Sequence, residues 1–306
     1  MTSDWRHILK TDPTPWLLEP DNPSVRYFTL TEILDRPATD AEVQEAKAAI
    51  MDSAIVREIF ARQHPDGHWE KKEKPFHGKG TANHLLVLAE LGIEPHERVK
   101  RACESVFQYG QLESGGFSYT GTRSGFLLCG TAYTLRFLVR FGYGEDPRTQ
   151  KGFRHLAETL KDEDGLRCRS AEGQPCLWAA VKALWAFAEI PKAMRSEHVQ
   201  EVIERLAEAV LGYDFDFAER EKRWLKFGFP LTYQSDVLDA TGALVRLGYG
   251  PDPRLRKFIE IVIEQQDEGG RWIKRTGATV IRGGRRGQPS KWVTLRALRI
   301  LKGVYR

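Results

Sequence analysis

The stretch IEQQDEGGRW, from Ile263 to Trp272, joins a helix-like run to a Gly-Gly turn and closes on tryptophan. A second copy, QHPDGHW, lies at Gln63–Trp69, and a weaker one, QLESGGF, lies at Gln111–Phe117, where phenylalanine replaces tryptophan. A glutamine at the end of a helix can bond carbonyls that lack a helical partner, glycine can adopt a positive φ, and the tryptophan can pack over the helix end. We therefore predict a structural role for Trp69 and Trp272, not a catalytic one.

These copies belong to a repeat with a period of about 50 residues. The turn glycines are Gly67, Gly116, Gly165 and Gly270, and the segment GYDFDFA around Asp216 fills the missing place. Each period contains a charged helix, the glycine turn, a long irregular loop and a more apolar helix. Glycine and then proline follow three of the apolar helices, in ELGIEP, RFGYGEDP and RLGYGPDP, where a left-handed cap favours glycine.

The helical pattern predicts an all-α protein. Charged helices that carry one apolar face should pack outside the apolar helices, and no segment alternates strictly enough for a strand. We count about six inner and about five outer helices, and closure would cover the inner ones on every side. The prediction is an α/α toroid, a barrel of helical hairpins that forms a single domain over residues 1–306, with residues 1–20 as an extension that packs on the ring.

The composition, with 41% hydrophobic and 29% charged residues, is typical of a globular protein with a large core. No leader-like segment and no apolar run of about 18 residues is present, so we expect a soluble cytoplasmic protein.

The four cysteines form no CxxC pair, which favours reduced thiols. A net charge of +4 is too small for a composition typical of nucleic-acid binding.

The motifs at Gln63–Trp69 and Gln266–Trp272 resemble the QW repeat of squalene and terpenoid cyclases, whose relatives include the protein prenyltransferase β subunits. This resemblance implies an α/α barrel with a central cavity and an isoprenoid substrate. The chain departs from the family patterns, because it has neither an Asp-x-Asp-Asp motif nor a magnesium-binding Asp-Asp-x-x-Asp cluster. Of the zinc ligands that the resemblance implies, Cys176 is present, but Gln174 and Gln234 stand where aspartate and histidine are expected. We expect no cofactor.

Four residues are the catalytic candidates. Asp236 and Asp239 are three apart, so both project from one face of a helix, and burial beside a like charge would raise a pKa and keep a carboxylic acid protonated. The alternative is structural: Asp236 caps the helix and Asp239 bonds a neighbouring hairpin. Tyr233 and His84 are the further acid-base candidates.

Other polar and aromatic residues on the inner helices could line a pocket, where aromatic faces can stabilise positive charge on an isoprenoid chain. These candidates are Tyr133, Trp178, Trp292, Cys129, Cys176 and Asn83. The alternative for the aromatic residues is ordinary core packing. His84, Cys129 and Cys176 are zinc-type ligands, but their spacing is not that of a local metal motif, so no metal is predicted.

The loop at 271–291 carries arginine and lysine without an acidic residue. Arg282, Arg285 and Arg286 could hold a diphosphate or another anionic head group beside glycine-rich backbone. A solvated loop is the alternative, and nucleic acid or an acidic membrane surface would be bound by the same residues.

The sequence therefore predicts a terpenoid-cyclase-like enzyme that acts on a hydrophobic, isoprenoid-type substrate by acid-base chemistry in the central cavity of the toroid. The reaction would be that of a cyclase, or of a lyase or isomerase. A non-catalytic toroid that binds a lipid or a peptide is the first rival. A nucleic-acid binder that uses the 271–291 loop is the second, and no nucleic-acid partner is expected. Peripheral membrane contact and the oligomeric state are left open.

Overall fold

The computed structural model describes residues 5–120, 122–168, 173–213, 221–281 and 284–305. These ranges are helical, with isolated bridges but no strand among them, so the all-α class is confirmed. The α-helices are α1 (Thr14–Leu17), α2 (Pro23–Phe28), α3 (Ala41–Met51), α4 (Ala54–Ala61), α5 (Thr81–Glu90), α6 (Glu97–Gly110), α7 (Leu128–Leu138), α8 (Pro147–Thr159), α9 (Leu177–Ala188), α10 (Glu197–Leu211), α11 (Val237–Arg246), α12 (Arg256–Glu264) and α13 (Lys291–Tyr305). Arg282 and the segment around Asp216 lie outside the described residues.

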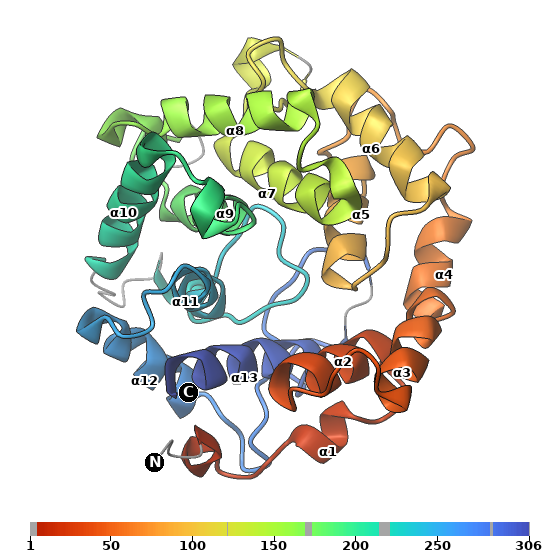
Figure 1. Ribbon diagram of the computed structural model, residues 1–306, viewed down its shortest axis with the longest axis vertical. Helices are drawn as coiled ribbons and strands as arrows, with labels where there is room; N and C mark the ends of the chain where they lie inside the picture. Colours follow the sequence, from red (N-terminus) through yellow and green to blue (C-terminus); the bar gives the residue numbers. More distant parts are fainter. Residues whose placement is uncertain (1–4, 121, 169–172, 214–220, 282–283, 306) are drawn as a thin grey trace. The chain divides into compact units, whose positions relative to one another are not determined.

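The chain contacts form two compact units. Unit 2 contains Ile59–Tyr213 and Thr232–Gln234, and unit 1 contains the rest of the chain. Unit 2 has two layers: α5, α7 and α9 pack side by side, and each pairs with the amphipathic helix that follows it, α6, α8 or α10 (Figure 1). This is the predicted pairing of apolar with charged helices. Closure of all the hairpins into one ring, as one domain, stays a prediction.

Unit 1 is organised around α13, which packs against α11 and α2, while α12 packs against α11 and α3 against α2. The segment 40–63 forms two helices, α3 and α4. The break comes at Asp52 and Ser53, where the Ser53 N–H donates to the Ile50 carbonyl at 3.2 Å. Short polar residues of this type favour turns over helix interiors.

Glycine ends the inner helices as predicted. Gly92, Gly142 and Gly248 have φ values of 79°, 86° and 96°. In the turns that follow the outer helices, Gly67 and Gly270 have positive φ values of 97° and 65°, again as predicted. In the second repeat the prediction was wrong by one residue, since Gly115, not Gly116, has φ 103°. Gly165 lies in a 3-10 turn at Glu163–Leu166, where its N–H donates to the side chain of Asp162.

The tryptophans of the two complete motifs are structural, as predicted. Trp69 and Trp272 are 1% and 0% exposed. The indole N–H of Trp69 donates to the carbonyl of Ile59 at 2.8 Å, and that of Trp272 donates to the carbonyl of Val262 at 2.7 Å. Each indole therefore binds a carbonyl in the outer helix that precedes its turn, where such groups lack helical partners.

The backbone N–H of the aromatic residue in all three motifs donates to a buried threonine hydroxyl. The pairs are Trp69 with Thr81 at 3.1 Å, Phe117 with Thr131 at 2.9 Å and Trp272 with Thr294 at 3.0 Å. Each threonine lies in an inner helix and is 0% exposed. The sequence analysis did not single out these threonines, which join each turn to the inner helix that follows it.

The motif glutamines join each turn to the next outer helix. The Gln63 side-chain N–H donates to the carbonyls of Gly67 at 2.8 Å and Arg98, in α6, at 2.9 Å. Gln111 bonds the carbonyls of its own turn and of α8 in the same way, at 3.1 and 2.9 Å. Because the two glutamines make the same bonds, the hydrogen-bonded contacts of the turn repeat with the same period of about 50 residues as the sequence motif.

In the last motif, residues 8–11 take the place of a following outer helix. Gln266 donates to the carbonyl of Ile8 at 3.2 Å, and the Lys10 N–H donates back to the Gln266 side-chain oxygen at 3.1 Å. The Thr11 hydroxyl donates to the carbonyl of Glu268 at 2.8 Å. These bonds fix part of the predicted 1–20 extension within unit 1.

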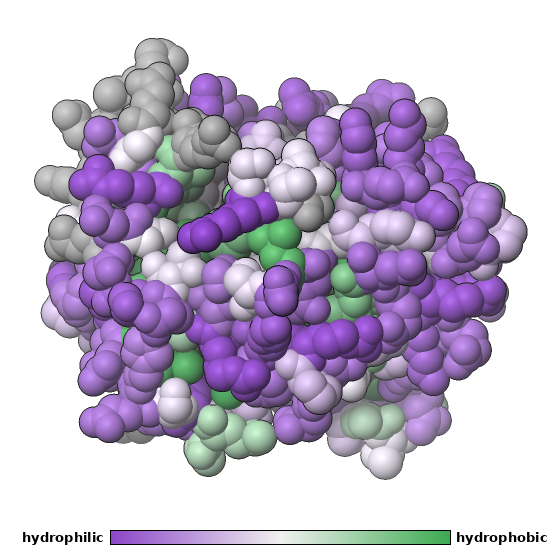
Figure 2. Space-filling view, turned by 90° about the horizontal axis from the view of Figure 1, so that it is seen from above, coloured by the Kyte–Doolittle hydropathy of each residue, from purple (hydrophilic) through white to green (hydrophobic). Residues whose placement is uncertain are grey.

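Figure 2 shows one face that is mostly hydrophilic, with hydrophobic residues visible only in small separate patches. Across the described ranges, no helix combines the length and the apolar character that crossing a membrane would require.

Candidate functional site

The N-terminal ends of α7 and α9, and Tyr233 of the same unit, carry apolar side chains that are not fully buried. We call this group the α7–α9 surface: Leu127, Leu128, Cys129, Cys176, Leu177, Trp178 and Tyr233. Tyr233 is 48% exposed, and its ring centroid lies 6.5 Å from that of Trp178. Partly exposed aromatic and aliphatic groups that gather in one place mark a surface suited to an apolar ligand. Of the residues predicted from the sequence, Cys129, Cys176, Trp178 and Tyr233 are therefore brought together.

Three cysteines meet at this surface. The backbone around Arg167 and Pro175 forms an antiparallel bridge, in which the Cys176 N–H donates to the Leu166 carbonyl at 2.9 Å. This turn brings the thiols of Cys168 and Cys176 close together, and Cys129 of α7 lies near both. Cys168 was not among the predicted residues, because it lies in an irregular loop with no helical period.

The thiols of Cys129 and Cys176 stay protonated at neutral pH. Burial raises the pKa of Cys129 to about 12, and it also raises the pKa of Cys176. A thiolate is the nucleophilic and metal-binding form of cysteine, so a protonated thiol acts here chiefly as a small apolar group with a weak S–H donor.

Beneath the surface, Tyr133 and Asn83 form a buried pair. The Tyr133 hydroxyl donates to the Asn83 side-chain oxygen at 3.1 Å. The Asn83 amide in turn donates to the carbonyls of Phe76 at 3.1 Å and Gly78 at 3.0 Å. Burial raises the pKa of Tyr133 well above its ordinary value, so this phenol remains neutral. Both residues were predicted pocket residues, and the structure fixes them by hydrogen bonds.

Tyr119 is a further residue of this site that the sequence analysis missed. It is partly exposed, its ring lies 5.8 Å from that of Phe76, and it is close to Cys129 and Tyr233. Burial raises its pKa. Tyr119 belongs to the loop after the Phe117 turn, and an aromatic residue two positions after a motif aromatic is the one sequence signal that could have indicated it.

His84 lies in a structural environment. Its ring stacks on Trp69 with 4.8 Å between centroids and 10° between planes, and its Nδ1 lies 3.2 Å from the carbonyl oxygen of Gly80. The side chain is 2% exposed, and burial lowers the pKa of His84 to about 4. The imidazole is therefore neutral at neutral pH.

In unit 1, Asp236 and Asp239 form a cluster with Arg296 of α13. Asp236 is 1% exposed and caps α11, since its Oδ1 accepts the Asp239 N–H at 2.7 Å and its Oδ2 accepts the Gly228 N–H at 2.8 Å. The Arg296 guanidinium donates to both Asp236 oxygens, at 3.1 and 3.3 Å, and to Asp239 at 3.4 Å. The predicted proximity of the two aspartates and the capping alternative are confirmed.

The protonation of Asp236 reflects opposing effects. Burial raises the pKa of Asp236, the guanidinium of Arg296 lowers it, and the charge of Asp239 raises it again. In all four of these hydrogen bonds an Asp236 oxygen accepts from an N–H group. An ionised carboxylate can accept at every lone pair, whereas a protonated one must donate at one oxygen. The geometry therefore suits the carboxylate, and an acid role for Asp236 stays a prediction.

The remaining predicted residues lie in unit 1. Trp292 is 5% exposed and stacks on Phe229, with 4.2 Å between centroids and 6° between planes. This is the core packing that the sequence analysis named as the alternative. Arg285 and Arg286 are exposed, while Lys291 of the same basic segment forms an ion pair with Glu19 at 2.7 Å.

The sequence matches none of the protein-family models and none of the curated proteins with which it was compared. Among solved structures, a protein from Actinoplanes is 14% identical with a TM-score of 0.48, over 94% of this chain and 90% of that one. The type II terpene cyclase MstE from Scytonema is 15% identical with a TM-score of 0.48, over 92% and 87% of the two chains. An MstE variant in complex with geranylgeranyl dihydroxybenzoate is 16% identical with a TM-score of 0.48, over 93% and 87%.

Proposed function

We propose that this protein is a terpenoid-cyclase-like enzyme that binds a hydrophobic, prenyl-type substrate on the α7–α9 surface. The observation that carries the proposal is the partial exposure of Trp178 and Tyr233 beside aliphatic side chains and uncharged thiols. A prenyl chain has only apolar surface and double bonds. Its transfer from water to such a surface is therefore favoured by the hydrophobic effect. The indole and phenol faces would also stabilise positive charge that develops on the chain.

We assign proton transfer at this surface to Tyr119 in preference to Asp236. Tyr119 is partly exposed and close to Cys129 and Tyr233, so its hydroxyl can reach a ligand bound there. Asp236 already uses both oxygens to bond N–H groups of the chain. In a double-bond isomerisation Tyr119 would give its proton to one carbon of the double bond and take a proton back from an adjacent carbon, which regenerates the phenol.

A non-catalytic lipid-binding protein is the second candidate. The raised pKa values of Cys129, Cys176, Tyr119 and Tyr133 favour it, because these groups stay uncharged at neutral pH and suit binding without reaction.

Binding is tested by the thermal midpoint of the purified protein with farnesol, geranylgeraniol and their diphosphates. A ligand that binds only the folded state raises the midpoint. Trp178→Ala and Tyr233→Ala should abolish the rise. Met194→Ala is the matched control, because Met194 is 62% exposed and follows the other end of α9. A prenyl ligand that shifts no midpoint, or shifts that of all variants equally, would refute binding at this surface.

Turnover separates the two candidates. The prenyl compound that binds is incubated with the wild-type protein and with Tyr119→Phe, and the products are identified by gas chromatography and mass spectrometry. The enzyme proposal predicts a new isomer or elimination product that Tyr119→Phe fails to form while it still binds the ligand. Binding without any product supports the lipid-binding candidate.

A further inference from the structure

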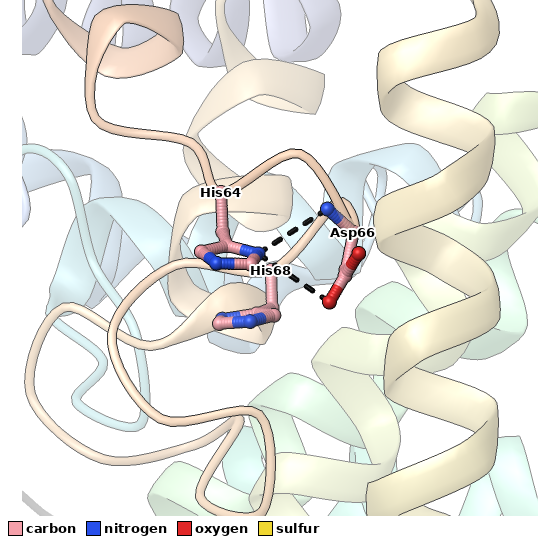
Figure 3. Close-up of side chains that lie close together, drawn as sticks. All are labelled: His64, Asp66 and His68. Atoms are coloured by element: carbon pink, nitrogen blue, oxygen red, sulfur yellow. Dashed lines mark hydrogen bonds and ion pairs between the residues drawn. The ribbon is translucent and has the colours of Figure 1, made fainter.

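The turn between α4 and α5 contains three metal-ligating side chains within five residues: His64, Asp66 and His68. One ligand atom from each lies within 4.8 Å of the other two, and no other group of three histidine, cysteine, aspartate or glutamate side chains in the described ranges meets this criterion. Figure 3 shows Asp66 beside the Nδ1 atom of His64, with the His68 ring next to that of His64. The sequence analysis gave this turn a structural role only.

The backbone of the turn is held in place independently of these side chains. The Gly67 N–H donates to the His64 carbonyl at 2.8 Å, and the His64 N–H donates to the His68 carbonyl at 2.9 Å. The Gln63 side chain bonds the Gly67 carbonyl, and Arg101 bonds the Pro65 carbonyl at 3.0 Å. Backbone fixed in this way lowers the ordering cost of binding an ion.

The positions and exposure of the ligand atoms leave room for a cation. The Asp66 N–H donates to His64 Nδ1 at 3.3 Å, so the Nδ1 lone pair is engaged, and an ion bound there must displace this long hydrogen bond. The Asp66 carboxylate oxygen lies 3.5 Å from the same nitrogen, and its side chain is 71% exposed. His68 Nδ1 is buried and has no hydrogen-bond partner among the described residues. A buried polar atom without a partner calls for an explanation, and a bound ion is one.

The two imidazoles stack, with 4.4 Å between centroids and 17° between planes. The lone pair of each ring nitrogen lies in the ring plane, so two parallel rings cannot both bind one ion. Binding therefore requires at least one ring to turn about its side-chain torsions. The exposed side chain of His64, at 53%, has room for this movement.

We propose that His64, Asp66 and His68 bind one divalent transition-metal ion of the Ni²⁺, Cu²⁺ or Zn²⁺ class per chain. Two imidazole nitrogens and one carboxylate oxygen suit these ions better than Mg²⁺ or Ca²⁺, which favour oxygen ligands. Three protein ligands leave coordination positions for water or for a further ligand.

The test is isothermal titration of the tag-free protein with Ni²⁺ in a non-chelating buffer. We expect one ion per chain, and each of His64→Gln, Asp66→Asn and His68→Gln should weaken binding at least about 10-fold. His198→Gln is the matched control, since His198 is a 45% exposed histidine within 4.0 Å of two glutamates but outside this group, and it should leave binding unchanged. Because His64 and Asp66 are exposed, their variants should keep the thermal midpoint of the wild type.

Electron paramagnetic resonance of bound Cu²⁺ identifies the ligands directly. The wild type should show coupling to two nitrogens, and each histidine variant to one. Cys168→Ser, which removes a soft thiol ligand outside this turn, should leave this spectrum unchanged. Binding that survives in all three ligand variants, equal loss in His198→Gln, thiolate signals, or no binding by the wild type would each overturn the proposal.

Discussion

Arg296 donates hydrogen bonds to Asp236 from both terminal nitrogens of its guanidinium, and Asp236 is also the N-cap of α11. A carboxylate that is 1% exposed and bonded in this way holds α11, α13 and the Gly228 backbone in one arrangement. When one partner of a buried ion pair is neutralised, the other is left as an uncompensated charge.

Asp236→Asn should therefore destabilise the protein by about 3 kcal/mol, even though asparagine is itself a good cap. Asp252→Asn is the control, because Asp252 also caps a helix and bonds Arg254, but that guanidinium is 42% exposed. The control should cost less than about 1 kcal/mol. Urea unfolding measures both changes, and equal midpoints for Asp236→Asn and wild type would disprove the structural role.

Thr131→Val should cost about 1–3 kcal/mol, because the N–H of Phe117 loses its acceptor in a buried place. Thr134 provides the comparison within the same helix. It is also 0% exposed, but its hydroxyl has no partner among the described residues. Thr134→Val should be neutral or stabilising. Similar losses for the two variants would show that volume, not the hydrogen bond, sets the cost.

Gly67→Ala should be more destabilising than Gly248→Ala. The two glycines have nearly equal φ values, 97° and 96°. An added side chain should therefore reduce the free energy of unfolding by the same amount at each, about 1–2 kcal/mol, through backbone strain. At Gly67 the new Cβ would also lie 2.7 Å from Arg101, whereas nothing lies within 4 Å at Gly248. The overlap should add about 1–3 kcal/mol, measured as the difference between the two unfolding free energies.

His84 should make stability depend on pH. The folded pKa is about 4 and the ordinary value is 6.5, so between these values the unfolded chain binds the proton more tightly than the folded one. The contribution of the neutral imidazole is complete above about pH 6.5 and is lost progressively as the pH falls to about 4, for a total of about 3 kcal/mol.

His84→Phe keeps an aromatic ring beside Trp69 but removes the proton. The difference in unfolding free energy between wild type and variant, measured at several pH values, isolates His84 from the other titrating groups. That difference should shift by about 3 kcal/mol between pH 7 and pH 4. A constant difference over this range would mean that His84 is already protonated or solvated in the folded protein.

The repeat and its helix ends could be predicted from the sequence because they depend on local chemistry. Gly92, Gly142 and Gly248 stop helices through a backbone preference that each residue carries by itself. The burial of Trp69 and Trp272 followed from the same local pattern.

The contacts that join repeats could not be predicted in this way. The threonine that accepts the motif N–H lies 12, 14 or 22 residues further along the chain, so no fixed spacing marks it. Arg296 lies 60 residues from Asp236, and only the packing of α11 on α13 brings them together. Tyr119 and Cys168 lie in loops, where hydrophobic periodicity carries no information.

The bonds of the motif glutamines also bear on the order in which the chain can fold during translation. Gln63 and Gln111 find their partners 35 and 37 residues later, so these turns can close while synthesis continues. Gln266 instead bonds Ile8, 258 residues earlier. The segment around Ile8 must therefore wait for a partner that is synthesised 258 residues later, while the continuous part of unit 2, Ile59–Tyr213, can already be complete.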